Sequence, residues 1–565
     1  MKTKQPKVKI RHNTPLLFIV LLSALVHGGY YNFFAFLCGA VLTGLIVYQA
    51  YKEQKILIPT GLTAWCLCGL CLCQLVTMPF AVSAGMAFAG FLRIFVWLLF
   101  FVYAHSYTRE ERHLILDTVA YEGAILALFS IIGFVYDRIA GINDLNGRID
   151  GSFEYANTWA LFQLLCLVFL LLRKNRKAID YPAIGVLLCG IFLSGSRGTL
   201  LLLVLLAVFA AGYYAIVKKK LLPILLGLVG VVGMLVLASR ASGGMVLERI
   251  RGISLSSSTL LGRILYWKDG IRLLWEHPMG LGRGGYLYIQ APEQTGIYIL
   301  RHVHNEYLQM ALDGGILAGV LMVVLVMGLL WKKQKTIREY AAIFLIGAHS
   351  LIDFDLQFSA VVFLLLLCGT EEKTKEIKPA KPGLLPRIGA GCLALLFCYV
   401  SLGYYLHLGG NYAASRKLLP GDLEIAEDYM LSLGEPALAE PIADEIIAKT
   451  DLSMLAWDCK FAAAEQRQDM EQMVHAKYQY LVLNPYRGTV YEEFADVLEA
   501  AYAQGSPREQ TAYREYAEQA MVLLETVMER TDPLAYEIID KPDFGFSNTL
   551  LARLSQIARR EVEMK

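Results

Sequence analysis

Charged residues are scarce in this 565-residue sequence: 18% of the chain is Asp, Glu, Lys or Arg, whereas 56% is hydrophobic. Soluble domains carry about 25% charged residues, so most of this chain suits a lipid bilayer better than water. Its mean hydropathy of +0.47 agrees with that. A single soluble core, a freely secreted protein and a nucleic-acid-binding protein are therefore poor interpretations of the composition.

Cysteines are scarce where a disulfide framework would be useful. Of the 11 cysteines, only Cys459 lies in the acidic C-terminal part, so no disulfide network is expected there. Residues 66–73 read CLCGLCLC, a spacing that suggests a metal site, but the run lies in the middle of an apolar segment, where thiolates are costly. We interpret its four cysteines as packing residues.

The formal net charge of +2 hides two unlike parts. From Leu408 to the end, 15 Lys and Arg stand against 28 Asp and Glu, a net charge of −13. The residues before Leu408 carry 37 against 22, a net charge of +15. A basic apolar part followed by an acidic polar part indicates a membrane domain joined to a soluble domain.

Apolar stretches of the length that crosses about 30 Å of hydrocarbon recur along the basic part. They predict an all-α fold: a polytopic membrane bundle of about 13 helices with a long outer loop and a soluble C-terminal α-helical, repeat-like domain. The predicted spans are residues 15–31, 33–51, 56–76, 84–104, 114–136, 157–172, 181–195, 198–217, 221–238, 314–331, 340–352, 356–369 and 388–407.

Basic clusters mark every second loop, as the positive-inside rule requires of cytoplasmic loops. This pattern predicts a multi-pass protein of the cytoplasmic (inner) membrane, with a cytoplasmic N-terminus and an outward C-terminal domain. The expected parts are a cytoplasmic tail (1–14), a transmembrane domain (15–370), a cytoplasmic linker (371–387), a last transmembrane helix (388–407) and an extracytoplasmic helical domain (408–565).

Two polar regions lie on the outward side in this topology. The outer loop, residues 239–313, is far longer than a connection needs to be. Its phrase GRILYWKDGIRLLWEHP predicts an amphipathic helix that lies on the membrane surface or packs in an outer subdomain. In the C-terminal domain, helical patterns divided by an Asn-Pro turn at 484–485 and by Gly505 resemble tetratricopeptide-like hairpins, which typically bind a protein partner.

The outward loops hold residues that could carry chemistry. Arginines present planar forks that suit the oxygens of a diphosphate, and a neighbouring histidine can take a proton from a hydroxyl. The candidates are Arg197 in SGSRGTL, Arg263 in LLGRILYW, Arg283 in LGRGGY, and His302, His304, Asn305 and Glu306 in HVHNEY. Together they predict group transfer from a diphosphate-linked donor at the outer face.

Simpler interpretations stand beside this one. Arg197 could be a snorkelling residue at a helix end, and Arg263 could pair with Asp269 or Glu276 of its own helix. The two histidines of HVH could bind a metal, and Glu306 could supply one further ligand, but the spacing lacks the full set of third and fourth ligands expected nearby. We therefore predict neither a metal nor another cofactor.

Polar residues within or beside the spans form a second group of candidates. Arg93 lies near the middle of the fourth predicted span, where a charge is expensive. It could face a cavity and hold a phosphate, but we favour an ion pair with Glu122 of the fifth span. His349 and Asp353 form a further polar cluster, of which helix capping by Asp353 explains a part.

The order of five phrases resembles the O-antigen ligase and O-antigen polymerase superfamily, multispan bacterial transferases that take glycans from undecaprenyl diphosphate. The resemblance covers roughly residues 15–370, and the acidic helical domain lies beyond it. The phrases are GRIDGSFEYANTWA (147–160), LSGSRGTLLLLV (193–204), LGRILYWKDGIRLLWEHPMGLGRGGY (261–286), HVHNEYLQMALDGGILAG (302–319) and HSLIDFDLQ (349–357).

The resemblance implies a metal-independent, inverting reaction and assigns roles to residues. His304 matches the family's catalytic histidine and would activate the acceptor, with His302 as a rival for that role. Arg197 and Arg263 match the family's outer arginines and would bind the diphosphate and offset its developing charge. The residues expected to bind substrate are Arg283, His302, Asn305, Arg93 and Asp353.

We therefore expect a glycosyltransferase that moves a glycan from an undecaprenyl-diphosphate-linked donor to a hydroxyl of a glycan, a lipid or a protein. Whether it acts as a ligase or a polymerase stays open. One alternative is a non-enzymatic glycan carrier or lipid flippase, although a transporter would typically show paired, broken spans. The other is a scaffold whose helical domain recruits a protein partner to the membrane.

Overall fold

The computed structural model describes residues 14–140, 147–219, 221–254, 256–332, 334–370, 373–377, 384–544 and 548–558. The predicted cytoplasmic tail lies outside these ranges except for its last residue, and the predicted linker at 371–387 is described only in part. The chain is helical almost throughout. The prediction of an all-α membrane protein is thereby confirmed.

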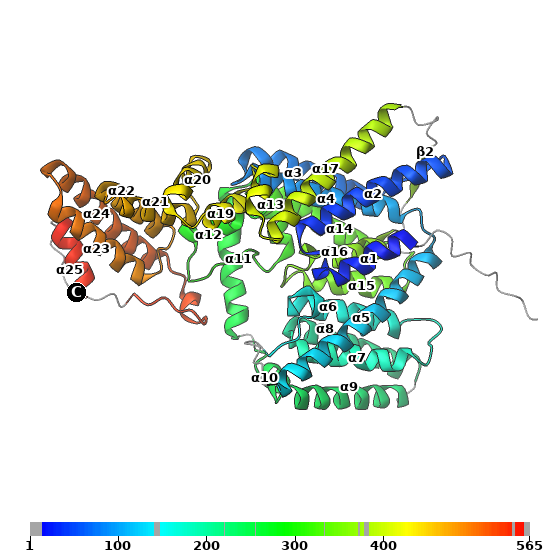
Figure 1. Ribbon diagram of the computed structural model, residues 1–565. Helices are drawn as coiled ribbons and strands as arrows, with labels where there is room; N and C mark the ends of the chain where they lie inside the picture. The colour runs from blue at the N-terminus through cyan, green and yellow to red at the C-terminus, as the bar shows by residue number, and fades with distance from the viewer. Residues whose placement is uncertain are drawn as a thin grey trace, which may run out of the picture.

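The first part of the chain is a bundle of helices (Figure 1), several of which run through a common apolar core. The helices of this bundle are α1 (Thr14–Leu25), α2 (Asn32–Glu53), α3 (Leu62–Thr77), α4 (Ala84–Ala104), α5 (Arg109–Ile139), α6 (Ala156–Leu171), α7 (Asp180–Ser194), α8 (Arg197–Gly212), α9 (Leu222–Ala241), α14 (Ile316–Trp331), α15 (Ile337–His349), α16 (Ser359–Gly369) and α17 (Leu384–Leu408).

Each of the 13 predicted spans corresponds to one helix of this bundle. Seven helical stretches of the described chain are long and apolar enough to cross a membrane, and five shorter helices are apolar. The remaining helix, α15, has 13 residues and carries Arg338 and Glu339 in its first turn. The multi-pass character of the protein follows from this set, although α15 has too few apolar residues to be a span by itself.

A two-stranded antiparallel sheet joins two distant loops at the end of the bundle. Strand β1 (Ile56–Pro59) pairs with β2 (Thr374–Ile377), so the prediction that the third span begins at residue 56 is wrong. Pro59 and the extended Gly61 interrupt the apolar run, and α3 begins only at Leu62. The pairing places the loop before α3 and the loop before α17 on one side of the bundle.

The segment 239–313, predicted as the outer loop, lies at the opposite end. It contains α10 (Met245–Arg251), α11 (Ser258–Glu276), α12 (Gly285–Glu293) and most of α13 (Glu306–Gly314). The helix predicted from GRILYWKDGIRLLWEHP is confirmed as α11, which runs crosswise to the bundle helices (Figure 1). It buries Leu265 and Leu273 and leaves Trp275 on the surface.

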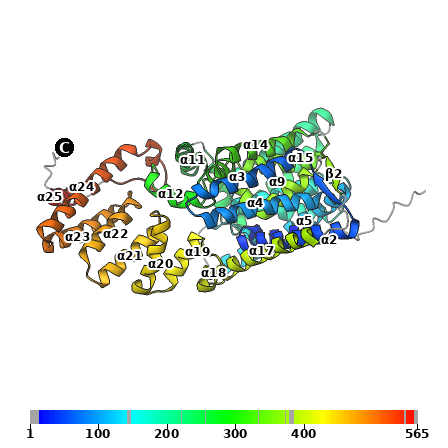
Figure 2. The ribbon, with the colours of Figure 1, turned by 90° about the horizontal axis from the view of Figure 1, so that it is seen from above.

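After α17 the chain forms an array of short helices that extends away from the bundle, with α11 and α12 between the two parts (Figure 2). The predicted helices on either side of the Asn-Pro turn are confirmed as α22 and α23; the tetratricopeptide resemblance itself stays a prediction. The array consists of α18 (Tyr412–Leu418), α19 (Leu423–Ser432), α20 (Pro436–Lys449), α21 (Met454–Gln466), α22 (Met470–Val482), α23 (Gly488–Gln504), α24 (Pro507–Arg530) and α25 (Asn548–Ala558).

Candidate functional site

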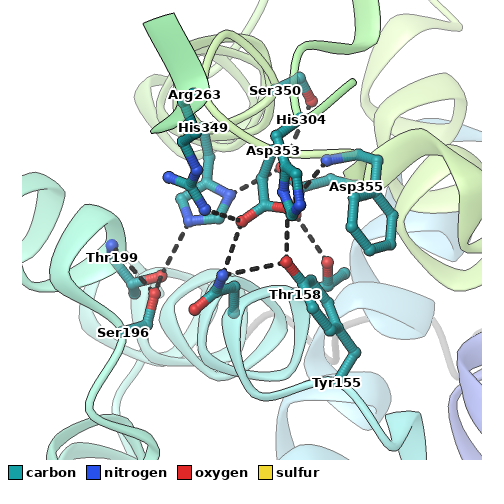
Figure 3. Close-up of polar contacts among 12 residues, drawn as sticks. Tyr155, Thr158, Ser196, Thr199, Arg263, His304, His349, Ser350, Asp353 and Asp355 are labelled. Carbon is teal, nitrogen blue, oxygen red and sulfur yellow. Dashed lines mark hydrogen bonds and ion pairs between the residues drawn. The ribbon is translucent and has the colours of Figure 1, made fainter. Parts of the chain in front are cut away.

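The site is organised by the short turn between α15 and α16, which carries two buried carboxylates, Asp353 and Asp355 (Figure 3). Asp353 accepts hydrogen bonds from the hydroxyl of Tyr155 at 2.8 Å and from the side-chain amide of Asn157 at 2.8 Å. Both donors stand at the start of α6, a helix that is buried on all sides in the bundle. The bundle core therefore fixes the position of the Asp353 carboxylate.

His304 meets this carboxylate from the 239–313 segment. Its Nδ1 lies 3.2 Å from Asp353 Oδ1, and 19% of its side chain is exposed. The backbone of His304 has φ +52°, the left-handed region that non-glycine residues seldom adopt. Trp267 Nε1 donates to its carbonyl oxygen at 3.3 Å and holds the strained residue in place. With Nδ1 directed at a carboxylate, Nε2 is the nitrogen free to take a proton.

Arg263, on α11, approaches the same carboxylate from the other side. Its Nη2 lies 3.1 Å from Asp353 Oδ2. The alternative of a pair with Asp269 or Glu276 is wrong: residues pair along a helix when three or four positions apart, and the Asp269 carboxylate instead accepts hydrogen bonds from Thr295 and from the hydroxyl of Tyr298.

The charges around Asp353 keep it ionised. Burial alone would raise its pKa, but the hydrogen bond from His304 and the charges of Arg263 and His304 hold the pKa well below its usual range. An ionised Asp353 fixes the tautomer of His304 that carries its proton on Nδ1, and it stabilises the imidazolium that forms when Nε2 is protonated.

A second histidine–carboxylate pair lies beside the first and is fully buried. His349 Nδ1 is 2.7 Å from Asp355 Oδ2, and His349 Nε2 is 3.2 Å from the hydroxyl of Thr199. Thr199 in turn contacts Ser196, the residue that caps α8. This chain of contacts fixes the start of α8, where Arg197 is the first helical residue. The His349–Asp355 pair therefore helps to fix the position of Arg197.

Arg197 belongs to a group of arginines that also includes Arg249 and Arg148. A β-carbon on Gly252 would lie 2.8 Å from Arg197 Nη2, and one on Gly195 would lie 2.5 Å from Arg249 Cδ, so both side chains rest on glycines. Burial and the charge of Arg197 lower the pKa of Arg249, and burial and the charge of Arg249 lower the pKa of Arg148 to about 10.

Two members of this group, Arg197 and Arg249, lack a matching negative charge in the part of the chain that the structure describes. Across the described ranges, neither Arg197 nor Arg249 makes an ion pair with a carboxylate, and the buried Nε of Arg197 has no hydrogen-bond partner. Arg148 links the group to the site, because its Nη2 donates to Asn157 at 2.7 Å. Like charges held this close favour the binding of an anion between them.

His302 has a different environment from His304. It is 8% exposed, and its Nε2 lies 3.2 Å from the hydroxyl of Tyr30. Burial, with the charges of Arg283 and Arg301, lowers the pKa of His302 well below its usual range. The ring of Phe354 separates the two histidines, with centroids 4.7 Å from His302 and 5.2 Å from His304. Of the two, only His304 contacts a carboxylate.

Arg93 and Arg283 lie together at another place. Both line a cavity whose lining residues include neither His304 nor Asp353. Arg93 donates to the carbonyl oxygens of Tyr30, Gly29 and Gln357 and to the side chain of Asn32. Its predicted pair with Glu122 is wrong, because its two terminal nitrogens donate to these groups instead. Arg283 Nη1 donates to Gln357 Oε1 at 2.7 Å.

Asn305 and Glu306 support the turn at His304. The Asn305 side chain accepts from the backbone N–H groups of Tyr307 and Leu308 and so caps α13. Glu306 is fully buried and accepts from the side-chain amide of Gln357 at 2.7 Å. Both side chains are occupied in holding the segment that carries His304.

Several residues of the site were not singled out from the sequence. Arg148, Tyr155 and Asn157 stand in the phrase GRIDGSFEYANTWA, which contributed to the resemblance as a whole, and the signal that could have found them was this density of polar residues before an apolar helix. Arg249 gave no signal. Among the described residues, no group of three or more His, Cys, Asp and Glu could hold a metal ion.

An all-α, multi-pass membrane protein with a histidine–aspartate pair and clustered arginines at one end of its bundle is the class that this fold and this site define. Within that class, residues 182–323 match the family model described as O-antigen ligase, and the chain is similar to that family over this quarter of its length. No curated protein and no solved structure gives a significant match. The matched residues run from α7 to α14 and include His304, Arg197, Arg249 and Arg263. The match confirms the resemblance and supports a glycosyltransferase-like role at a membrane in polysaccharide assembly.

Proposed function

We propose that the protein is an integral membrane glycosyltransferase that moves a glycan from a polyprenyl diphosphate, of the undecaprenyl type, to an acceptor hydroxyl. The observation that carries the proposal is the junction at Asp353, where a partly exposed histidine and an arginine share one buried carboxylate. A base and an anion-binding group are thus held side by side, as transfer from a diphosphate requires.

The geometry supports a one-step inverting transfer. His304 Nε2 takes the proton of the acceptor hydroxyl while that oxygen attacks the anomeric carbon of the donor sugar. The bond between the anomeric carbon and the diphosphate oxygen breaks, and the polyprenyl diphosphate leaves with its electron pair. Arg197, Arg249 and Arg263 stabilise the negative charge on the departing diphosphate, and the reaction uses no metal.

The proposed orientation follows from the distribution of basic loops. The basic clusters at residues 52–55, 109–112 and 173–177, together with Lys332 and Lys335, belong to the end of the bundle that carries β1 and β2, and such clusters are typical of the cytoplasmic side. The site at the other end then faces outward from the cytoplasmic membrane, where the acceptor is a glycan, a lipid or a protein. The acidic helical array lies on that same outward side.

The test is transfer from a purified polyprenyl-diphosphate glycan in proteoliposomes. We expect wild-type transfer in the presence of EDTA, and losses of about a hundredfold or more in His304→Ala and Arg197→Ala. His277→Ala, in the same segment but outside the network of contacts, is the matched control. Unchanged product from His304→Ala would remove the base assignment. Loss of wild-type transfer in EDTA would remove the metal-free mechanism, and movement of the donor across the bilayer without transfer would favour a flippase.

A further inference from the structure

The C-terminal helical array contacts the segment that carries His304 and Arg263 at two separate places. The first involves α19, near the start of the array in the sequence, and the second involves the turn after α24, near the end of the array in the sequence. About 100 residues lie between these contacts in the sequence (424 to 532). The array thus spans the segment between two docking points.

At the first docking point, Glu424 of α19 forms a bidentate pair with Arg301. The two Arg301 nitrogens lie 2.9 and 2.6 Å from the two Glu424 oxygens. Beside this pair, the buried carboxylate of Glu427 accepts hydrogen bonds from the hydroxyls of Tyr288 at 2.8 Å and Ser453 at 2.5 Å. Tyr288 belongs to α12 and Ser453 caps α21, so a buried network joins the two parts.

The bundle also contributes to the first docking point. A β-carbon on Gly85, at the start of α4, would lie only 2.2 Å from the backbone carbonyl of Gly421, just before α19. Ser83 donates to that same carbonyl oxygen at 3.0 Å. The reverse substitution is permitted, because a β-carbon on Gly421 would have ordinary contacts with Gly85, the closest at 3.5 Å. The backbone contact between α4 and the array therefore excludes a side chain at Gly85 but tolerates one at Gly421.

At the second docking point, Asp532 pairs with Lys268 of α11 at 2.6 Å, and its backbone N–H donates to the carbonyl of Thr295 at 3.0 Å. Ala535 packs against Leu265 of α11. The chain at Gly296 passes between these two residues, since a β-carbon there would lie 2.8 Å from Leu265 and 3.0 Å from Ala535.

The two docking points lie on either flank of the site. Arg301 precedes His304 by three residues, and Leu265 and Arg263 are two residues apart on α11, so they point to different sides of that helix. Arg263 reaches Asp353 in the bundle, whereas Leu265 lies in one apolar cluster with Ala535 of the array. Helix α11 is therefore held between the bundle and the array.

We propose that the C-terminal helical array is a brace that holds the 294–306 chain and α11 against the bundle, and thereby sets the positions of His304 and Arg263. Arg301, Glu424, Lys268 and Asp532 are positioning residues in this view, since none of them touches the Asp353 junction. The effect on transfer rests on the proposed function; the ordering of the 294–306 chain does not.

Charge reversal tests the brace directly. A single ion pair at a surface contributes little to stability, so neutralising one partner would have a weak effect, whereas Arg301→Glu places like charges at the docking point. We expect Arg301→Glu and Glu424→Arg each to lower the protection of backbone amides from hydrogen exchange at residues 294–306 in the full-length protein. The variant that carries both substitutions, the double exchange, should restore this protection. Arg467→Glu, which breaks a surface pair inside the array, should leave protection unchanged.

A steric pair of variants gives a second, independent measurement. Gly85→Ala should lose the same protection, because its β-carbon meets backbone atoms of the array, while Gly421→Ala should match the wild type. The proposal is overturned if Arg301→Glu and Gly85→Ala both keep wild-type protection at 294–306, or if the double exchange fails to restore it.

Transfer measured on the same variants separates the brace from the proposed function. We expect kcat to fall about ten- to a hundredfold in Arg301→Glu, with little change in the KM for the donor, and to recover in the double exchange. Lost protection with unchanged kcat would show that the array does not position the site. If the wild type performs no transfer while the protection pattern is as expected, the proposed function fails and the docking stands.

Discussion

At the scale of single residues, the proposed chemistry depends on how one carboxylate is shared. Asp353 is 1% exposed and bonds to two donors from α6, to His304 and to Arg263. A carboxylate in this position ties the proposed base and the proposed anion-binding arginine to one rigid point. Any change in its charge acts on both partners at once.

Asp353→Asn keeps the size of the side chain and removes its charge. We expect kcat/KM for transfer to fall at least about a hundredfold, because the amide neither stabilises the His304 imidazolium nor attracts Arg263. Asp428→Asn is the matched control, since Asp428 forms a 2.7 Å pair with His407 that lies at the end of α17, away from the site. Kinetics of the two purified variants within twofold of each other would contradict the prediction.

The pH dependence of transfer distinguishes the two histidines. Burial holds the pKa of His302 below its value in an unfolded chain, so this ring stays neutral as the pH falls through the range in which transfer is measured. The acid limb of the pH profile, which is the fall in kcat/KM for transfer as the pH is lowered, should therefore persist in His302→Gln. The acid limb should be absent from the residual activity of His304→Gln, because that variant lacks the proposed base. Loss of the acid limb in His302→Gln would reassign the base.

At the scale of elements, the arginine group shows how short helix ends make a binding site. The first residue of α8, the last turn of α10 and the loop before α6 each contribute one arginine. Glycines at 195 and 252 allow these elements to approach. The arginine group forms because the ends of these three helices meet there.

Arg249→Gln should weaken donor binding. Loss of one charged hydrogen bond to the diphosphate costs about 1.5–3 kcal/mol, which is roughly ten- to a hundredfold in the KM for the donor. Arg251→Gln, on the exposed side of the same short helix, is the control and should be neutral. A donor titration that gives equal KM values for the two variants would remove Arg249 from the site.

Much of this level could be predicted from the sequence. The lengths of the apolar stretches predicted a helix at each position of the bundle, and the Asn-Pro turn predicted the boundary between α22 and α23. The strand at 56–59 could not be predicted, because its partner at 374–377 lies more than 300 residues away and neither strand alone has a strong pattern. For the same reason, the residues His304 and Arg263 could be identified as candidates, but their common partner Asp353 could be assigned only as a substrate-binding residue.

At the scale of the whole molecule, the division into a basic part and an acidic part corresponds to the bundle and the array. The site lies at the end of the bundle where the array docks. The strand pair lies at the other end. The sequence predicted this division through charge alone, whereas the docking depends on tertiary contacts that no local pattern reveals.

The proposed orientation can be measured with cysteines introduced one at a time into a Cys459→Ser background, with the labelling of that background alone as the control for the other native cysteines. We expect Gln468→Cys, in the array, and His277→Cys, after α11, to react with a membrane-impermeant maleimide on intact cells. Thr60→Cys, beside β1, should react only after permeabilisation. Each position is at least partly exposed in the structure. Labelling of Thr60→Cys on intact cells, or protection of the other two, would reverse the topology.

The docking of Asp532 and Ala535 on α11 also bears on how the protein is made. A ribosome has already delivered every bundle helix, His304 and Arg263 by the time α17 emerges, yet the residues of the second docking point come more than 120 positions later. A chain interrupted between these points would hold all the residues of the Asp353 junction without the contacts that flank α11. The proposed brace is then complete only after residue 535 has been made, so copies interrupted before that point and left in the membrane would transfer more slowly than finished ones.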